Sequence, residues 1–290
     1  MINVARIDQH LSLRRRWKNH FMLGLVTLAA ITAILPLMIV FFHILKEGLP
    51  ALSFEFFTSL PAPTGQPGGG MGNAIAGSAI LVALASAVAV PIGVLGGVYL
   101  SEYADGQVAN LFRWTTDLLT SLPSIVVGLF VYATVVAPFK SFSAYAGAAA
   151  LAILMVPIVV KTTEEVLKLM PQHVREAGLA LGLPRWRVIL FVVLRGRLPA
   201  VMTGVILALA RIAGETAPLL ITAFGNRNWP QALSEPTPSL PVQIFNYAIS
   251  PFADWQRQAW AGALTLVFLV FALNLVARLW LARDASGRSA

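Results

Sequence analysis

The charged residues of this chain are spaced so that they leave several apolar stretches of about 20 residues or more, the length that a helix needs to cross a bilayer. Of the 290 residues, 57% are hydrophobic and only 12% are charged, whereas a soluble domain has about 25% charged residues. The mean hydropathy of +0.75 points the same way. The sequence therefore predicts an all-α integral membrane protein.

Six membrane-spanning helices are predicted from the gaps between charged residues. In chain order these gaps lie within 18–46, 56–101, 117–140, 140–161, 198–224 and 257–278. The fifth differs from the others because it carries ionisable residues, Arg211 and Glu215, at its middle.

The basic residues predict how these helices are oriented. With the N-terminus placed in the cytoplasm, the cytoplasmic segments hold sixteen Arg and Lys residues and the outer segments hold four, and Arg211 accounts for the last of the 21. Because cytoplasmic loops carry the excess of Lys and Arg in membrane proteins, both termini are predicted to be cytoplasmic. The net charge of +8 has the same origin, so nucleic-acid binding is not expected.

The spans divide the chain into five predicted segments. They are a cytoplasmic N-terminal segment (1–20), a first transmembrane helix (21–45), an external loop (46–72), a core of five further transmembrane helices (73–282) and a cytoplasmic tail (283–290). The core contains a cytoplasmic loop (162–197) and an external loop (225–257). The first apolar run is longer than that of a signal peptide and no cleavage site follows it, so it is predicted to stay as an anchor. The Pro- and Gly-rich loop 46–72 favours a solvated connection over a ligand contact.

Neither a metal site nor a cofactor is predicted in this chain. It has no cysteine, and its four histidines have no ligand spacing. The sequence also lacks the Gly-x-x-x-x-Gly-Lys-Ser/Thr loop that cradles phosphates, so the chain is not expected to bind or hydrolyse ATP. Energy must come from another subunit or from an ion gradient, and both alternatives stay open.

Glycine and proline patterns predict how the spans pack and bend. Gly93 and Gly97 in the second span form a small-xxx-small pattern that lets two helices approach closely in lipid. Four prolines fall within or at the edge of spans two to five: Pro91, Pro123, Pro157 and Pro218. Each leaves a backbone carbonyl that needs another partner, which fits a plain kink and a pathway break equally well.

The polar stretch 162–197 predicts a helix-Gly-helix elbow. Pro171 suits a first helical position, and Gly182 supplies a left-handed cap before Pro184 begins a second helix. Small and apolar residues recur at helical spacing along the first helix: Val174, Ala177, Gly178 and Leu181. This stripe would let another protein come close, while Glu176 beside it accepts hydrogen bonds from that partner.

The elbow resembles the Glu-Ala-Ala loop in the permease subunits of prokaryotic ABC importers. The matching residues are Glu176, Ala177, Gly178 and Gly182, with Gly178 in place of the second alanine. Arg195 stands where the family has a proline, and Leu198 and Pro199 follow it. The resemblance implies that the elbow docks on an ATP-hydrolysing subunit and transmits motion, so the role is coupling and not catalysis. The alternative is an amphipathic hairpin on the membrane surface.

Arg211 and Glu215 are four residues apart and are predicted to share one helix face. Ionisable residues at mid-membrane face the protein interior or a water-filled cavity. A guanidinium offers a fork of donors that matches a tetrahedral oxyanion and keeps its charge on burial. The carboxylate would repel an anion unless that anion carries a proton, as hydrogen phosphate does and sulfate does not. The pair therefore favours a phosphate pathway, and a purely structural ion pair is the alternative.

Two segments, 214–220 (GETAPLL) and 122–130 (LPSIVVGLF), closely resemble the permease of phosphate-specific ABC importers, in particular the A-type (PstA) subunits. The resemblance implies a six-helix type I importer (MetI-like) permease for inorganic phosphate, with Arg211, Glu215 and Thr216 on the substrate pathway. It also implies a multi-pass protein of the bacterial cytoplasmic (inner) membrane. The implied partners are a second homologous (PstC-type) permease, two PstB-type ATPase subunits that bind ATP and Mg, and an external PstS-type phosphate-binding protein.

Two other transport functions remain open. A permease for another oxyanion, sulfate or molybdate, would share the elbow but does not need the carboxylate. A proton-coupled secondary carrier would use Glu215 as its proton site and needs no elbow. A structural or assembly role without transport leaves the intramembrane charges unexplained.

Overall fold

The structure is a computed structural model that describes the backbone of residues 4–286 and the side chains of residues 14–275 and 279. Parts of the predicted N-terminal segment (1–3) and tail (287–290) lie outside the described residues. The described part is helical and contains no strand beyond an isolated bridge between Pro61 and Gly69. Among its helices, five are long and apolar enough to cross a membrane, and a sixth span results if one bent pair is counted together. The all-α prediction with six spans is confirmed.

The helical elements of the described residues are, in chain order, α1 (Val4–Gly48), η1 (Leu49–Ala51), α2 (Phe54–Thr58), α3 (Gly72–Glu102), α4 (Gly106–Ser121), α5 (Ser124–Val131), η2 (Tyr132–Val136), α6 (Ala137–Phe139), α7 (Ala144–Lys168), α8 (Gln172–Ala180), α9 (Arg185–Arg187), η3 (Val188–Leu194), α10 (Arg195–Ala213), α11 (Ala217–Leu220), α12 (Leu240–Ala248) and α13 (Ala253–Ser286).

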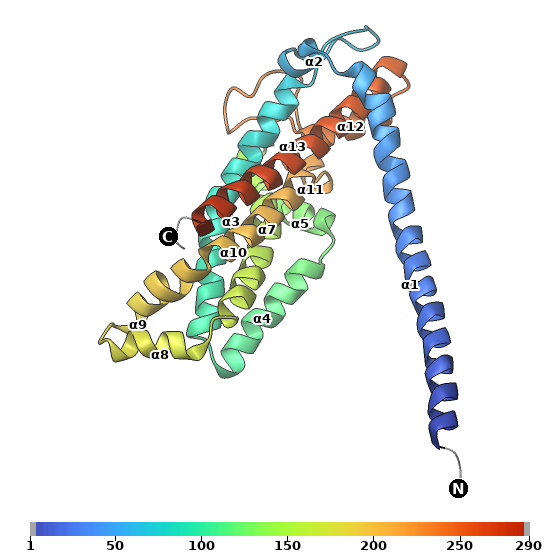
Figure 1. The fold of residues 1–290 in the computed structure, drawn as a ribbon. Helices are drawn as coiled ribbons and strands as arrows, with labels where there is room; N and C mark the ends of the chain where they lie inside the picture. Colours follow the sequence, from blue (N-terminus) through green and yellow to red (C-terminus); the bar gives the residue numbers. More distant parts are fainter. Residues whose placement is uncertain (1–3, 287–290) are drawn as a thin grey trace.

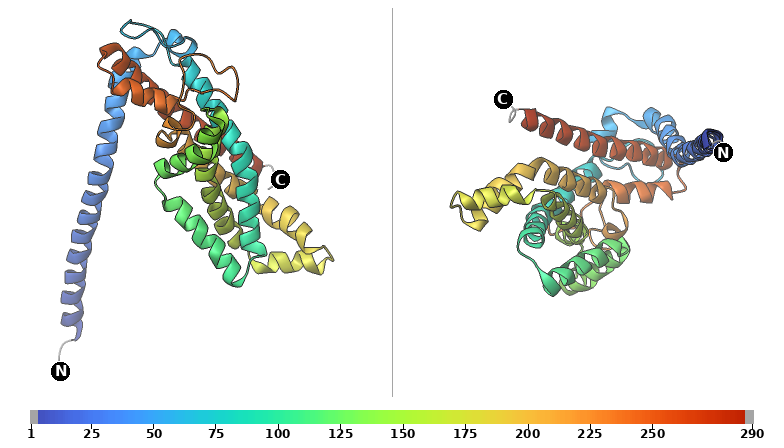
Figure 2. Two further views of the ribbon diagram at one scale, coloured as in Figure 1. Left: turned by 180° about the vertical axis from the view of Figure 1, so that it is seen from behind. Right: turned by 60° about the horizontal axis from the view of Figure 1, so that its bottom comes forward.

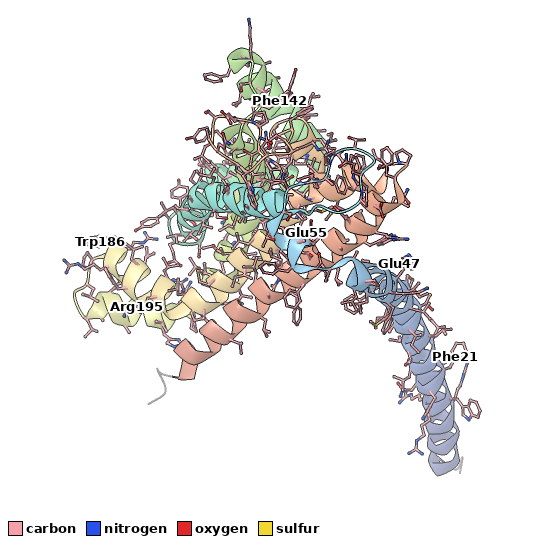
Figure 3. The ribbon with its side chains drawn as sticks, turned by 90° about the horizontal axis from the view of Figure 1, so that it is seen from above. Phe21, Glu47, Glu55, Phe142, Trp186 and Arg195 are labelled. Carbon is pink, nitrogen blue, oxygen red and sulfur yellow. The ribbon has the colours of Figure 1, made fainter. Side chains whose placement is uncertain are left out.

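Helix α1 stands apart from the bundle along most of its length, as Figures 1 and 2 show. Its apolar stretch contributes no buried side chain. The contact with the bundle lies at its last turns, where the ring of His43 meets that of Trp260 on α13 at a centroid distance of 4.8 Å. Figure 3 shows the helix leaving the bundle near Glu47, with Phe21 far out along it. An apolar helix without a protein neighbour is stable only in lipid or against another chain.

Helices α3 and α7 form the centre of the bundle through glycine contacts. A Cβ atom built on Gly93 would lie 2.6 Å from Cβ of Val159, and one built on Gly97 would lie 2.5 Å from Cβ of Thr163. Only glycine permits two helix backbones to approach this closely. The predicted role of these glycines in packing is confirmed.

The third span, predicted between 117 and 140, is sharply bent. Helix α4 begins earlier, at Gly106, and the chain bends by 101° between α4 and the helical stretch that starts at Ser124. The break lies at Leu122 and Pro123, because proline lacks an N–H and forces the residue before it out of the helical region; Leu122 has a ψ of 136°.

The fifth span also differs from its prediction over 198–224. One helical stretch runs from Arg185 to Ala213 through α9, η3 and α10, and Pro199 lies inside it. Gly214 ends the stretch, so Arg211 lies in the last turn and Glu215 lies beyond the helix, not at its middle. The spacing of charged residues placed the start of the fifth span at 198. In the structure the helix starts at Arg185, because the second helix of the elbow continues directly into the span.

The end of the bundle opposite α8 is closed by the loop 46–72, the loop 225–239 and α12 (Figure 1). Part of the loop 46–72 is packed, since Phe56 on α2 is 1% exposed and forms a cluster with Met71, Leu240 and Tyr247, whereas residues 63–68 are exposed. Ser53 caps α2 by accepting a hydrogen bond from the N–H of Phe56. The predicted solvated connection describes residues 63–68 but not the buried Phe56.

Candidate functional site

The elbow around α8 has the backbone that its sequence predicts. Pro171 precedes the helix in an extended conformation, and Gly182 adopts a φ of +78°, the left-handed conformation that glycine takes without strain. The N–H of Gly182 donates to the carbonyl of Leu179 at 2.9 Å. Pro184 then caps the next helical stretch, which begins at Arg185.

The small-residue stripe of α8 does not face outward as a whole. Gly178 is buried, and a Cβ built on it would lie 2.9 Å from Cγ1 of Val188 in the same chain. This glycine lets the two arms of the elbow pack together. Its predicted part in ATPase coupling stays a prediction. Glu176, Ala177 and Gly182 are exposed and remain the accessible part of the motif.

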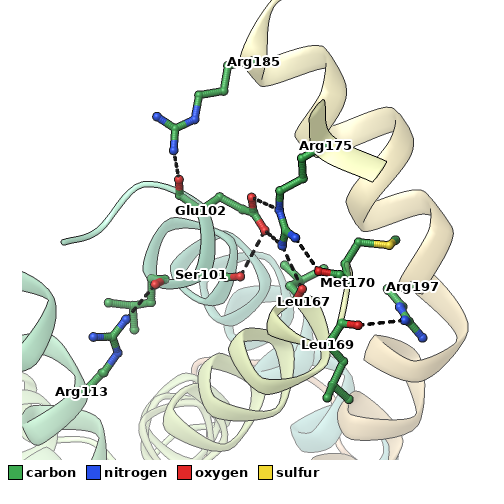
Figure 4. A network of polar contacts seen from close by, with 10 residues as sticks. Ser101, Glu102, Arg113, Leu167, Leu169, Met170, Arg175, Arg185 and Arg197 are labelled. Atoms are coloured by element: carbon green, nitrogen blue, oxygen red, sulfur yellow. Dashed lines mark hydrogen bonds and ion pairs between the residues drawn. The ribbon is translucent and has the colours of Figure 1, made fainter. Parts of the chain in front are cut away.

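A network of polar contacts joins the elbow to the end of α3 (Figure 4). The side chain of Arg175 donates to both carboxylate oxygens of Glu102, at 2.9 and 2.6 Å, and also to the carbonyls of Leu167 and Met170. Donation to Glu102 raises the pKa of the Arg175 guanidinium, which burial only partly opposes, so Arg175 stays charged at physiological pH. Arg185 donates to the backbone carbonyl of Glu102. One residue at the end of α3 therefore holds both arms of the elbow.

A second group of ion pairs joins α4 to α7 at the same end of the bundle. Glu164 on α7 accepts from Nε of Arg113 at 2.6 Å, and Nζ of Lys168 lies 2.6 Å from the same oxygen. Arg113 also donates to the carbonyl of Leu100 at 3.0 Å, and Lys161 pairs with Asp117. The bent α4 is thereby fixed to the central helices.

Sequence reasoning missed Glu102 and Arg175. The signals were present: Arg175 adjoins the Glu-Ala-Gly motif, and Glu102 is the first charge after the long apolar stretch that ends at Ser101. Their pairing joins residues 73 positions apart, which spacing along the chain cannot reveal.

Arg211 and Glu215 do come together, across the end of α10. Nε of Arg211 lies 4.0 Å from a carboxylate oxygen of Glu215, with the side chains 53% and 17% exposed. This distance is too long for a hydrogen bond, and no other described residue accepts one from the guanidinium, so within the described part of the chain its donors can serve a ligand. Thr216 follows at the start of α11, where its carbonyl accepts from the N–H groups of Leu219 and Leu220. The three predicted pathway residues therefore lie around the point where the helix is interrupted between α10 and α11.

The two segments that resemble phosphate permeases contact each other, although almost 90 residues separate them. A Cβ built on Gly128 of α5 would lie 2.6 Å from Cα of Pro218 on α11. Pro218 is buried, as are Val127 and Gly128. The broken third span thus packs against the broken end of the fifth, next to the charged pair. A break in each helix leaves backbone polar groups that need other partners, which membranes tolerate where the backbone is buried in protein or lines a water-filled cavity.

A single helical stretch joins the two candidate sites. The 29 residues from Arg185 to Ala213 begin at the elbow and end at the charged break, about 44 Å away at 1.5 Å per residue. The π-helical segment η3 lies within this stretch, directly after the elbow. Such segments are frequent at functional sites. Among the described residues no cluster of three or more His, Asp or Glu side chains could hold a metal ion.

Comparison with known proteins relates this architecture to a transporter family. Residues 89–283 match the family described as "Binding-protein-dependent transport system inner membrane component". The chain is 45% identical over 270 residues to the phosphate transport system permease protein PstA of Yersinia pestis, covering 93% of this chain and 92% of that protein. The PstA protein of Haemophilus influenzae is also 45% identical, over 92% of this chain and 94% of its own length.

The fold is that of solved ABC importer permeases. A chain of the MetNI methionine ABC transporter, in an inward-facing conformation, aligns with a TM-score of 0.57 at 16% identity, covering 73% of this chain and 93% of that chain. The segments 214–220 and 122–130, the elbow and the family match all indicate the same class of permease. The chain therefore belongs to the inner membrane component family of binding-protein-dependent transport systems, and within it to the PstA permeases.

Proposed function

We propose that this chain is the transmembrane permease subunit of an ATP-driven inorganic phosphate importer. The single observation that carries the proposal is the helical stretch Arg185–Ala213, which joins the exposed elbow to the charged break at Arg211 and Glu215. The PstA names of the relatives supply the substrate. As in those relatives, the chain acts as a transport subunit, and the ATPase is a separate protein.

Phosphate passes the break at the end of α10. Arg211 supplies donors to the oxyanion, and Glu215 accepts from the P–OH group of hydrogen phosphate, which sulfate lacks. Thr216, half-buried beside them, adds a hydroxyl that can both donate and accept. Movement of the α10 end relative to α11 would open or close this constellation.

Coupling takes place at the elbow. Glu176, Ala177 and Gly182 are exposed, and Leu181 and Trp186 next to them are 81% and 50% exposed, which suits a protein contact. Gly178 has the different role of joining the arms. An ATPase subunit that binds ATP and Mg would dock here. Because the two arms of the elbow are packed together and bonded to Glu102, the elbow and α10 would move as one rigid unit.

The assembly that this requires contains a second, PstC-type permease, two PstB-type ATPase subunits and an external PstS-type phosphate-binding protein. The chain lies in the bacterial inner membrane as a multi-pass protein, with both termini and the elbow in the cytoplasm. The excess of Arg and Lys in the segments on that side supports this orientation.

Uptake of labelled phosphate into vesicles that contain the complete complex tests the proposal. We expect uptake to require internal ATP, to survive an uncoupler and to be unaffected by excess sulfate. Uptake that collapses with the proton gradient and proceeds without ATP would instead make Glu215 a proton site. Inhibition by sulfate would indicate a general oxyanion permease.

The substitution Glu176→Arg distinguishes an ATP-driven importer from a proton-coupled secondary carrier. It reverses one exposed charge and should abolish ATPase association in an ABC importer. It should do little in a secondary carrier. Co-purification of the ATPase subunits with the permease gives the readout, and Glu165→Arg, an exposed charge reversal on α7, is the matched control.

A further inference from the structure

Two arginines in the first turn of α10, Arg195 and Arg197, lie beside exposed apolar side chains. Phe191 and Leu190, in the η3 segment just before them, are 59% and 39% exposed, and Leu169 after the end of α7 is 71% exposed. The carbonyl of Leu169 accepts from Nη2 of Arg197 at 3.1 Å, which brings α7 and α10 together here. These five residues form one surface of mixed character, which we call the arginine patch.

Contacts between helices place the arginine patch at the level where α3 ends. Gly196, between the two arginines, lies against Met170, since a Cβ built on it would be 3.1 Å from Cε of that residue. The carbonyl of Met170 accepts from Arg175, which also donates to Glu102, the last residue of α3. Glu102 is the first charge after the apolar stretch that ends at Ser101. Because charged residues mark the end of a membrane span, the patch lies where hydrocarbon meets the lipid headgroups.

The arm of the elbow that carries the arginine patch projects sideways from the bundle. Figure 3, which looks at the molecule from above, shows Arg195 on this arm, away from the central helices. A segment that leaves the bundle sideways at headgroup level has lipid beside it. There an exposed ring such as that of Phe191 can enter the acyl region, while an arginine side chain extends to the headgroups.

The arginine patch carries positive charge that the chain does not neutralise locally. No Asp or Glu occurs between residues 177 and 214. Within the described part of the chain, Arg197 donates to the carbonyl of Leu169 and has no carboxylate within ion-pair distance. Most N–H donors of its guanidinium are therefore open, and their planar fork can bind two phosphate oxygens at once.

We propose that the arginine patch binds the headgroup of an anionic phospholipid, such as phosphatidylglycerol, in the leaflet on the elbow's side of the membrane. The phosphodiester accepts hydrogen bonds from Arg195 and Arg197, and the acyl chains pack against Leu190 and Phe191. A zwitterionic lipid binds less well because its own ammonium group neutralises its phosphate. The depth of the patch and its apolar side chains favour a lipid over a water-soluble partner. Each arginine contributes roughly a fivefold preference for the anionic lipid.

Quenching by brominated lipids tests the arginine patch through a single label, because the chain has no cysteine of its own. The full chain with Leu190→Cys is labelled with a fluorophore and reconstituted in phosphatidylcholine bilayers. These contain either brominated phosphatidylglycerol or brominated phosphatidylcholine at the same fraction. We expect phosphatidylglycerol to associate with the labelled surface at least fivefold more strongly. Neither transport nor ATP takes part, so the result is independent of the proposed function.

Substitutions in the labelled chain identify the groups that bind. Arg195→Gln and Arg197→Gln should each lower the preference for phosphatidylglycerol roughly fivefold, as expected for the loss of one charge. Arg197→Lys should keep most of the preference, because it retains the charge and loses only the planar fork. Arg257→Gln is the matched control, since it removes a 73% exposed charge at the start of α13, at the other end of the bundle (Figure 1). It should leave the preference unchanged.

Equal quenching of the parent chain by the two brominated lipids would overturn the proposal, and so would an unchanged preference in both glutamine variants. Absence of quenching by either lipid would contradict it as well, because the surface would then face water or protein. If inorganic phosphate abolishes the preference and chloride at the same ionic strength does not, the arginines bind the free ion and the lipid assignment is wrong.

Discussion

At the scale of single residues, the candidate sites of this chain depend on the positions of small and charged side chains. Gly178, which by sequence belongs to a docking motif, is buried against Val188 of the same chain. Arg211 and Glu215, which by sequence belong to a helix face, lie on either side of a helix end. For Gly178 the local sequence did not identify the neighbour, whereas for Arg211 and Glu215 it identified the pair but not the helix end between them.

Replacing Gly178 by valine should destabilise the elbow. The added side chain meets Val188 within 2.9 Å of its first atom, and overpacking of this kind costs about 1–3 kcal/mol. Thermal unfolding of the purified chain in detergent measures the effect. Ala177→Val, at an exposed neighbour on the same helix, is the control and should leave the unfolding midpoint unchanged. Equal behaviour of the two variants would contradict the packing role.

Replacing Glu215 by glutamine should lower the rate of phosphate transport about tenfold and weaken the preference over sulfate. Glutamine keeps the shape and an acceptor oxygen but loses the charge that strengthens acceptance from P–OH, a difference on the order of 1–2 kcal/mol. Uptake into vesicles with and without competing sulfate measures both quantities. If rate and preference both stay at the parent values, Glu215 has a structural role only.

At the scale of elements, the carboxyl end of α3 controls the position of the elbow. Glu102 accepts from Arg175 with both oxygens, and its carbonyl accepts from Arg185, so α3 contacts both arms. The arms are in turn packed together at Gly178. We therefore expect a force applied to the exposed face of α8 to reach α3 and the stretch that ends at Arg211. This network is a physical connection between two sites, and its coupling needs a direct test.

Exchanging the partners of this ion pair provides that test. Either Glu102→Arg or Arg175→Glu alone should lower the free energy of unfolding by about 2 kcal/mol, less than the roughly 3–5 kcal/mol for a fully buried pair, because Arg175 is partly exposed. Each should also reduce phosphate-dependent ATP hydrolysis by the complex. The double exchange should recover part of both losses. Glu165→Arg, an exposed charge on α7, controls for the change in net charge. Strictly additive losses in the double variant would show that the pair does not act as a unit.

At the scale of the whole molecule, apolar surface is organised for lipid and for other chains rather than for water. The outward faces of α1, α4 and α5 carry large exposed side chains, including Phe21, Trp114 and Phe130. The buried core lies instead among α3, α7, α10 and α11, where glycine and alanine bring the backbones close. We therefore expect the bundle to fold around its centre without most of α1.

Removal of residues 1–40 should accordingly change the stability of the remaining bundle little. Residues 14–40, the part of the removed segment whose side chains the structure describes, have no buried side chain, and the contact of α1 with the bundle lies at later turns. We expect the unfolding midpoint in detergent to shift by no more than a few degrees. Gly48→Leu is the contrasting variant, since a Cβ there would lie 2.8 Å from the carbonyl oxygen of Trp260. A collapse of the truncated chain would show that α1 is part of the folding core.

The sequence by itself determined the class of the protein, because lipid accepts long apolar helices and the charges that interrupt them mark the spans. It also determined the elbow, since Pro171, Gly182 and Pro184 each restrict the backbone locally. The family could be predicted from the elbow and from the segments 214–220 and 122–130, because each motif is a set of residue types at fixed spacing along the chain. Each of these inferences uses only neighbours along the chain.

Tertiary structure alone decided the rest, because the energies involved come from residues far apart in sequence. The partners of Glu102, the burial of Gly178 and the contact of Gly128 with Pro218 all depend on how helices pack. The arginine patch lies at the level of the end of α3 for the same reason, because α10 packs against Met170 at Gly196 and Arg175 joins Met170 to Glu102.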